Sequence, residues 1–194
     1  MNRIDWTSLR QELSAHASAD EKEARDVRFV LDFLEAHPDD AHRRSQLEGH
    51  LTGSGFVLDA AREQVLLLHH GRLDRWLQPG GHGEGEHEPR RIALREIEEE
   101  TGLGALDLTP FPDANLLDVD VHGIPARAGE PAHWHLDLRY GFVARAGAEP
   151  RLSAESHALR WFPLDALPAD ADASLRRAVA RLRRPGGLVK EGAT

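Results

Sequence analysis

The sequence predicts an α/β or α+β sandwich with a helical arm at its N-terminal end. Apolar residues recur at helical spacing in the first 48 residues, and short strand-like stretches follow. Two further helical stretches, 89–101 and 174–184, lie among and after these strands without the regular alternation of a βαβ protein. A chain of 194 residues suffices for one domain with such an addition.

The arm comprises residues 1–48. Leu9 and Leu13 share one face of a first helix, and Asp20 can cap a second helix that ends at Pro38. The apolar stripe of this arm needs a partner surface, either on its own domain or on a second subunit. The second alternative would make the protein a homodimer.

The main domain is expected to span residues 49–184, followed by a flexible tail, 185–194. Strands are expected over 51–58, 64–69, 115–122, 133–145 and 158–162. Loops are expected over 76–85 and 123–131.

Composition excludes several classes of protein. The chain has no cysteine, so disulfides and thiolate metal sites are ruled out. It has no apolar run of about 18 residues that could span a membrane, and its first residues do not resemble a secretory signal, so a cytoplasmic location is expected. The net charge of −9 and the lack of a basic block argue against a dedicated nucleic-acid surface.

Residues 80–103 combine a glycine-rich loop with a helix that carries three carboxylates. On a helix, Glu96, Glu99 and Glu100 fall within one zone of roughly 100°. Hard divalent cations prefer oxygen ligands, and glycines let the backbone approach a phosphate closely. The plainer alternative is a solvated acidic face with an Arg95–Glu99 pair. The adjoining glycine loop makes a metal and phosphate site the better interpretation.

This segment resembles the Nudix box, Gly-x5-Glu-x7-Arg-Glu-U-x-Glu-Glu-x-Gly-U, in which U is a bulky apolar residue. Gly81 takes the first position, and the second half matches without a gap at Arg95, Glu96, Ile97, Glu99, Glu100, Gly102 and Leu103. The resemblance covers about residues 50–184 and leaves the arm outside. It implies a Nudix-type α/β/α sandwich with a mixed β-sheet.

The resemblance also implies residue roles. Glu96, Glu99 and Glu100, together with Gly81, would hold Mg²⁺ or Mn²⁺ ions that bridge to a diphosphate. Arg95 would orient a carboxylate, and in some members the residue at the position of Glu96 is the general base. The implied activity is that of a pyrophosphohydrolase, which cleaves a nucleoside diphosphate linked to another group. The implied partner is thus a small phosphorylated substrate.

One position departs from the family pattern, because the first box glutamate falls on His87. Glu86 or Glu88 could supply the missing carboxylate, His87 could bind the metal itself, or the position could be unused. The last case motivates a second hypothesis, a nucleotide-binding or regulatory protein with weak or no catalysis. A third hypothesis, an isomerase of allylic diphosphates, usually needs a cysteine, and this chain has none.

Further substrate contacts are expected outside the helix, although each of these residues could equally be an ordinary surface or packing residue. The candidates are His82, Arg72, Arg75, Arg139 and Glu155. Twelve histidines are many for this length, and His133 and His135 share one face of an expected strand. A zinc site made only of histidines has no close His-x3-His spacing to support it.

Overall fold

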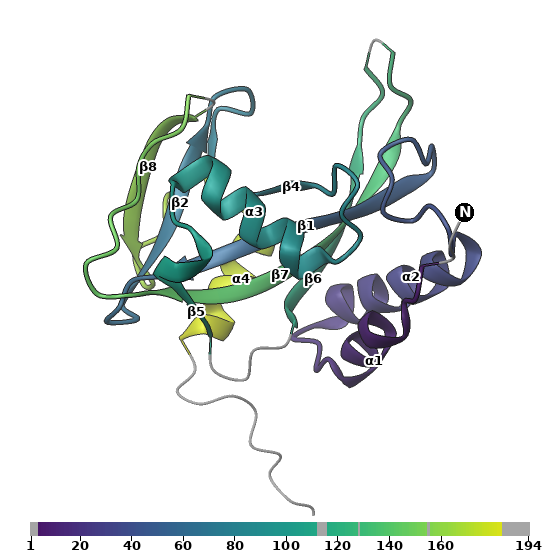
Figure 1. Ribbon diagram of the computed structural model, residues 1–194, viewed down its shortest axis with the longest axis horizontal. Helices are drawn as coiled ribbons and strands as arrows, with labels where there is room; N and C mark the ends of the chain where they lie inside the picture. The colour runs from purple at the N-terminus through teal and green to yellow at the C-terminus, as the bar shows by residue number, and fades with distance from the viewer. Residues whose placement is uncertain (1–3, 112–115, 128, 155, 184–194) are drawn as a thin grey trace, which may run out of the picture.

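A computed structural model of the protein describes residues 4–111, 116–127, 129–154 and 156–183 (Figure 1). The helices are α1 (Thr7–Ala15), α2 (Glu21–Ala36), α3 (Pro89–Thr101) and α4 (Ala173–Leu182), with a short 3₁₀ helix, η1 (Ala105–Asp107). The strands are β1 (Gly49–Leu58), β2 (Gln64–His70), β3 (Arg75–Leu77), β4 (Gly80–His82), β5 (Leu108–Pro110), β6 (Leu116–Ile124), β7 (His133–Ala144) and β8 (Ser156–Pro163).

The strands form one mixed sheet with β1 and β7 at its centre. These two strands run parallel from the pair Gly49 and Trp134 to the pair Leu58 and Val143. All other pairings are antiparallel: β2 and β4 flank β1, β5 and β6 flank β7, and β3 and β8 flank β2. Parallel strands require a long connection, and here that connection contains α3.

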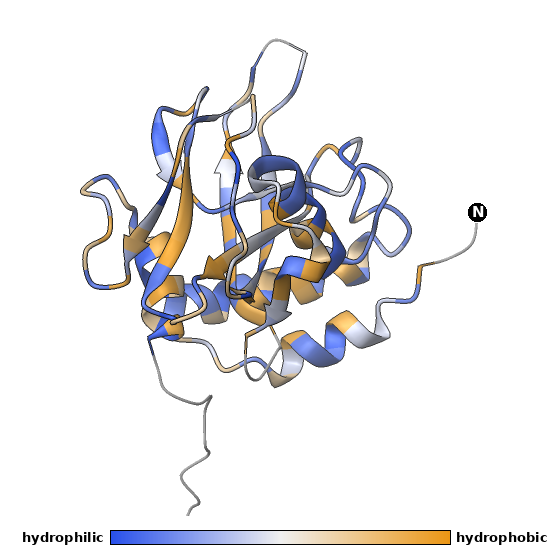
Figure 2. Ribbon diagram, turned by 60° about the vertical axis from the view of Figure 1, so that its left-hand side comes forward, coloured by the Kyte–Doolittle hydropathy of each residue, from blue (hydrophilic) through white to orange (hydrophobic). Residues whose placement is uncertain are grey.

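Helices cover both faces of the sheet. In Figure 1, α3 crosses in front of the strands and α4 lies behind them, and in Figure 2 the apolar residues gather along the strands between these helices. Two glycines of β1 let α3 approach closely. A Cβ atom on Gly53 would lie 2.3 Å from the carbonyl oxygen of Pro89, and one on Gly55 would lie 2.3 Å from Cδ1 of Ile97. The position of α3 therefore depends on small residues in β1.

The N-terminal arm packs on its own domain, and two carboxylates of α2 bind the backbone of β6. Glu23 accepts a hydrogen bond from the amide of Val119 at 3.2 Å, and Asp26 accepts one from the amide of Val121 at 3.0 Å. Lys22 adds an ion pair with Asp120 at 2.7 Å. The arm thus satisfies strand amides that would otherwise form an open sheet edge.

The expected fold class, an α/β/α sandwich with a mixed sheet and N-terminal helices, is confirmed. The loop expected over 76–85 is wrong in part, because β3 and β4 lie there. In β4, Gly80 and Gly81 pair with β1, and short glycine strands carry no sequence pattern. The strands expected over 115–122 and 133–145 are found as β6 and β7, and β6 extends into the expected loop as far as Ile124. The tail 185–194 lies outside the described residues. None of the described helices has the length and apolar character that crossing a membrane requires.

Candidate functional site

Helix α3 is fixed at both ends and along one side. It starts with Pro89 in its first turn, where proline is tolerated, and ends at Gly102, whose φ of 70° is left-handed. Ile92 and Ile97 are fully buried against the sheet. The predicted metal ligands Glu96, Glu99 and Glu100 lie beside this buried stripe.

Arg95 organises the carboxylates of α3. Its guanidinium donates to Oε1 of Glu96 and to Oε2 of Glu99, each at 2.7 Å. It also donates a hydrogen bond to the carbonyl oxygen of His82 in β4. Arg95 therefore connects the helix to the glycine-rich segment, as expected for a residue that orients a carboxylate.

The glycines of β4 touch the carboxylates directly. The amide of Gly80 donates to Oε2 of Glu100 at 3.0 Å. A Cβ atom on Gly81 would lie only 2.5 Å from Oε1 of Glu96. No larger residue fits at Gly81 unless Glu96 moves, so the backbone of β4 and the carboxylate stripe form one site.

The ionisation of Glu96 is finely balanced. Burial raises its pKa to about 7; Arg95 opposes this rise, and the neighbouring Glu99 adds to it. The side chain of Glu96 is 12% exposed, whereas that of Glu99 is 54% exposed. A cation bound between these groups would favour the ionised form of Glu96.

A cavity of about 930 Å³ opens beside the carboxylate helix. Its wall includes Gly80, Gly81 and Glu100 on one side. Four predicted substrate residues also line it: His82, Arg72, Arg75 and Arg139. The fifth, Glu155, lies outside the described residues. The structure therefore brings the backbone glycines, one helix carboxylate and several basic side chains to one cavity.

Arg139 differs from Arg72 and Arg75 because it is buried among carboxylates, whereas the ion pair of Arg75 with Asp172, at 3.7 Å, is partly exposed. Arg139 donates to Asp137 at 2.8 Å and to Asp118 at 3.2 Å, and these carboxylates hold its pKa above the usual range despite burial. Arg177 of α4 joins them through a 2.7 Å ion pair with Asp118. The sequence analysis did not predict this buried network. A signal was present, because each strand carries charged residues two positions apart, as on one strand face: Asp118 and Asp120 on β6, and Asp137 and Arg139 on β7.

The segment 86–88, which departs from the box, contacts itself, the first turn of α3 and the arm. The ring of His87 lies 6.0 Å from that of Trp6. Glu86 accepts hydrogen bonds from the amides of His87 and Glu88, at 2.7 and 2.9 Å, and Glu88 pairs with Arg91 at 2.7 Å. None of the three residues is part of the cavity lining.

Histidines from four strands meet beside another part of the cavity, and all of them except His50 line it. His50 of β1 pairs in register with His135 of β7, which pairs in turn with His122 of β6, so the three share one face of the sheet. His133 follows the same face, and Nε2 of His82 lies 3.2 Å from Nε2 of His135. His50 and His122 were not among the sequence candidates. The two-residue spacing of His133 and His135 did indicate histidines on one strand face. That His50 lies next to them depends on the long-range parallel pairing of β1 with β7, which the sequence does not reveal.

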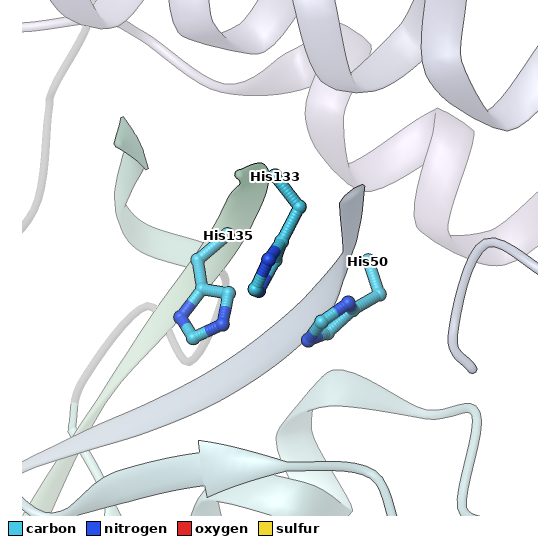
Figure 3. A group of neighbouring side chains, drawn as sticks. All are labelled: His50, His133 and His135. Carbon is cyan, nitrogen blue, oxygen red and sulfur yellow. The ribbon is translucent and has the colours of Figure 1, made fainter. Parts of the chain in front are cut away.

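Burial keeps several of these histidines neutral. It lowers the pKa of His50 to about 4 and that of His135 to about 2, and the neighbouring histidines add to both effects. Their rings therefore carry a lone pair at neutral pH. Figure 3 shows the rings of His50, His133 and His135 gathered beside strands β1 and β7.

Comparisons with known proteins identify the family of the chain. The model of the NUDIX domain matches residues 49–182. A relative from Lactococcus lactis subsp. cremoris (strain MG1363), named "Probable DHNTP pyrophosphohydrolase", is 30% identical over 97 residues, which are 50% of this chain and 57% of that protein. The match thus spans little more than half of the relative.

A solved structure supports the fold. The MutT NUDIX hydrolase from Burkholderia pseudomallei is similar with a TM-score of 0.50 and 28% identity, over 69% of this chain and 98% of that one. A NUDIX-family hydrolase from Clostridium perfringens has a TM-score of 0.49 and 26% identity, over 69% and 95%. With the family model matching most of the chain and a carboxylate helix that bears the second half of the box, this protein belongs to the Nudix family.

Proposed function

We propose that the protein is a divalent-metal-dependent pyrophosphohydrolase that acts on a nucleoside diphosphate linked to another group. The observation that carries this proposal is the contact between α3 and β4. Glu96 lies against Gly81, and Glu100 accepts a hydrogen bond from the amide of Gly80. Both glycines line the cavity. The carboxylates of α3 thus contact the strand backbone that borders the cavity; Glu100 lines the cavity, whereas Glu96 and Glu99 lie outside its lining.

The residues present fit a hard divalent ion. Carboxylate and carbonyl oxygens are the ligands that Mg²⁺ and Mn²⁺ prefer. Gly81 leaves free the space that a Cβ atom would take beside Glu96. Glu96, Glu99 and Glu100, with the backbone of Gly81, would hold the metal. A bound ion would polarise the phosphoryl oxygens and lower the pKa of an attacking water.

The protein's own groups then have separate tasks. Arg95 holds Glu96 and Glu99 in fixed orientations through its two 2.7 Å hydrogen bonds. Kept ionised by a bound cation, the carboxylate of Glu96 would accept a proton from the attacking water. Arg72 and Arg75 lie on the cavity wall, where their charges suit the remaining phosphate oxygens.

The size of the cavity supports the proposed substrate class. A volume of about 930 Å³ accommodates a nucleotide-sized ligand. The relative named as a DHNTP pyrophosphohydrolase makes that compound one member of the panel to be tested.

Four statements about the whole protein stay predictions. They are the boundaries of the arm, the boundaries of the 49–184 domain, the homodimer and the cytoplasmic location.

A substrate panel with metal titration tests the proposal. Nucleotide sugars, dinucleoside polyphosphates, nucleoside triphosphates and DHNTP are incubated with Mg²⁺ or Mn²⁺, and the phosphorylated products are identified. At least one compound should be hydrolysed, and Glu100→Gln should abolish its turnover. Glu98→Gln, an exposed residue of the same helix, is the matched control and should retain it. A folded wild-type protein that hydrolyses no member of the panel would overturn the proposal.

A second candidate, a nucleotide-binding protein without turnover, is favoured by one observation. His87 replaces the first box glutamate and contacts the arm, and neither flanking glutamate lines the cavity. This candidate predicts nucleotide binding by calorimetry with no product formed. Efficient wild-type turnover would eliminate it.

A further inference from the structure

We propose that His50, His133 and His135 form a second metal site, which binds a divalent transition-metal ion of the zinc type. Each histidine offers one ring nitrogen, and these atoms all lie within 4.8 Å of one another (Figure 3). The three residues come from the two central strands, so the sheet itself brings them together. The site stands on its own residues and does not depend on the proposed hydrolysis.

The unpaired nitrogens of this cluster are the main evidence. Nδ1 of His133 lies 2.9 Å from the carbonyl oxygen of Pro131. A carbonyl only accepts hydrogen bonds, so Nδ1 carries the proton, and Nε2 of the neutral ring carries a lone pair. That Nε2 atom is buried and has no hydrogen-bond partner among the described residues. A second contact that holds the far side of the ring is typical of histidines that bind metal.

His50 presents the same problem more sharply. It is 1% exposed, and neither of its ring nitrogens has a hydrogen-bond partner within the described part of the chain. Buried polar groups are normally satisfied, because leaving one unpaired is costly. A metal ion would use one lone pair from each of His50 and His133.

His82 can supply a fourth ligand from β4. Its Nε2 atom lies 3.2 Å from Nε2 of His135. Two nitrogens bound to one tetrahedral zinc ion are about 3.3 Å apart, since each Zn–N bond is about 2.0–2.1 Å. The spacing of this pair suits a shared ion, and the nitrogens of His50, His133 and His135, which lie within 4.8 Å of one another, would move closer together around it.

The donor set predicts which metal binds. Imidazole nitrogens suit Zn²⁺, Cu²⁺ and Ni²⁺, whereas Mg²⁺ requires oxygen ligands. The cluster should therefore bind Zn²⁺ and ignore Mg²⁺, and the carboxylates of α3 should prefer Mg²⁺. His82, His133 and His135 line the cavity, so the ion lies in its wall. It would also fix β4, in which His82 follows Gly81.

Zinc binding to the metal-free protein tests this site. The chain is stripped with a chelator and titrated with ZnCl₂ by calorimetry, and Co²⁺ is used in parallel as a spectroscopic probe. The wild type should bind zinc at the histidines, and the bound Co²⁺ should show the intense visible bands of a tetrahedral site. His133→Gln and His135→Gln should each lower this affinity at least about ten-fold. Wild-type protein that binds no zinc would overturn the proposal.

Two controls separate this site from the carboxylates and from misfolding. His157→Gln changes an exposed histidine on β8, and Glu99→Gln weakens the carboxylate site. Both variants should keep the histidine-bound zinc. His50→Leu replaces an unpaired polar side chain by an apolar one, should fold by circular dichroism, and should still lose the zinc. Equal affinity of the wild type, His133→Gln and His50→Leu would refute the assignment.

Discussion

Replacing Glu23 by glutamine tests how the arm is held on the domain. The Glu23 side chain is fully buried. It accepts hydrogen bonds from Nε2 of His16 at 2.7 Å, from the amide of Val119 at 3.2 Å and from Arg181 at 2.6 Å. Glutamine keeps the size of the side chain but removes its charge. It also replaces one accepting oxygen by an amide NH₂ group, which cannot accept hydrogen bonds from these donors.

The general cost of breaking a buried ion pair and the lowered pKa of Glu23 both indicate the size of the expected loss of stability. Removing one partner of a buried ion pair costs about 3–5 kcal/mol. Burial alone would raise the pKa of Glu23, but the contacts with His16, Ala19 and Arg181 lower it from 4.5 to about 2. That depression corresponds to about 3 kcal/mol of folding free energy at neutral pH. Both quantities predict a loss of about 3–4 kcal/mol, which is a large share of a typical stability of about 5–15 kcal/mol.

The assay is urea unfolding at pH 7, followed by far-ultraviolet circular dichroism. Glu21→Gln is the control, because that side chain is 98% exposed, and it should change the free energy of unfolding by no more than about 0.5 kcal/mol. Because the folded-state pKa of Glu23 is the lower one, its stabilisation is complete above about pH 5 and is lost as the pH falls toward about 2. Glu23→Gln should lack this part of the acid dependence. A variant within 1 kcal/mol of the wild type, with unchanged acid dependence, would refute the reasoning.

Three further changes test the carboxylate site and the histidine cluster. Gly81→Ala places a Cβ atom 2.5 Å from Glu96, and it should reduce metal-dependent turnover more than it reduces the free energy of unfolding. Arg95→Lys removes the planar fork that contacts Glu96 and Glu99, and it should lower turnover about ten-fold or more, with Arg91→Lys as the control. His50→Leu removes an unpaired buried group that costs about 1–3 kcal/mol, so the metal-free variant should be at least as stable as the wild type, but zinc should no longer raise its melting temperature. A melting temperature that still rises with zinc would contradict this.

Much of the fold was predictable because its patterns are local. The helix that ends at Gly102 follows from a helical run closed by a glycine, and the fold class follows from the box and its surroundings. The strand β4 was not predictable, because Gly80 and Gly81 have no side chains that could form a pattern. It exists because β1 offers a partner strand and Gly53 lets α3 lie against that strand.

The carboxylates of the candidate site were predictable from their helical spacing, and His82 was a candidate in the glycine-rich segment, whereas His50 and His122 were not predicted. His133 and His135 were identifiable as neighbours on one face because they are two residues apart. His50 joins them through the parallel pairing of β1 and β7, which are more than 80 residues apart along the chain. The buried network of Asp118, Arg139 and Arg177 has the same origin, because it joins β6, β7 and α4.

The central claim is that the carboxylates of α3 hold a divalent ion, and direct Mn²⁺ binding tests it without knowledge of the substrate. Free Mn²⁺ is quantified by electron paramagnetic resonance during titration of the wild type, Glu99→Gln and Glu98→Gln. We expect the wild type and Glu98→Gln to bind Mn²⁺ equally and Glu99→Gln to bind it at least about ten-fold more weakly, since it removes a charged oxygen ligand. Equal Mn²⁺ affinity in all three proteins would contradict the account.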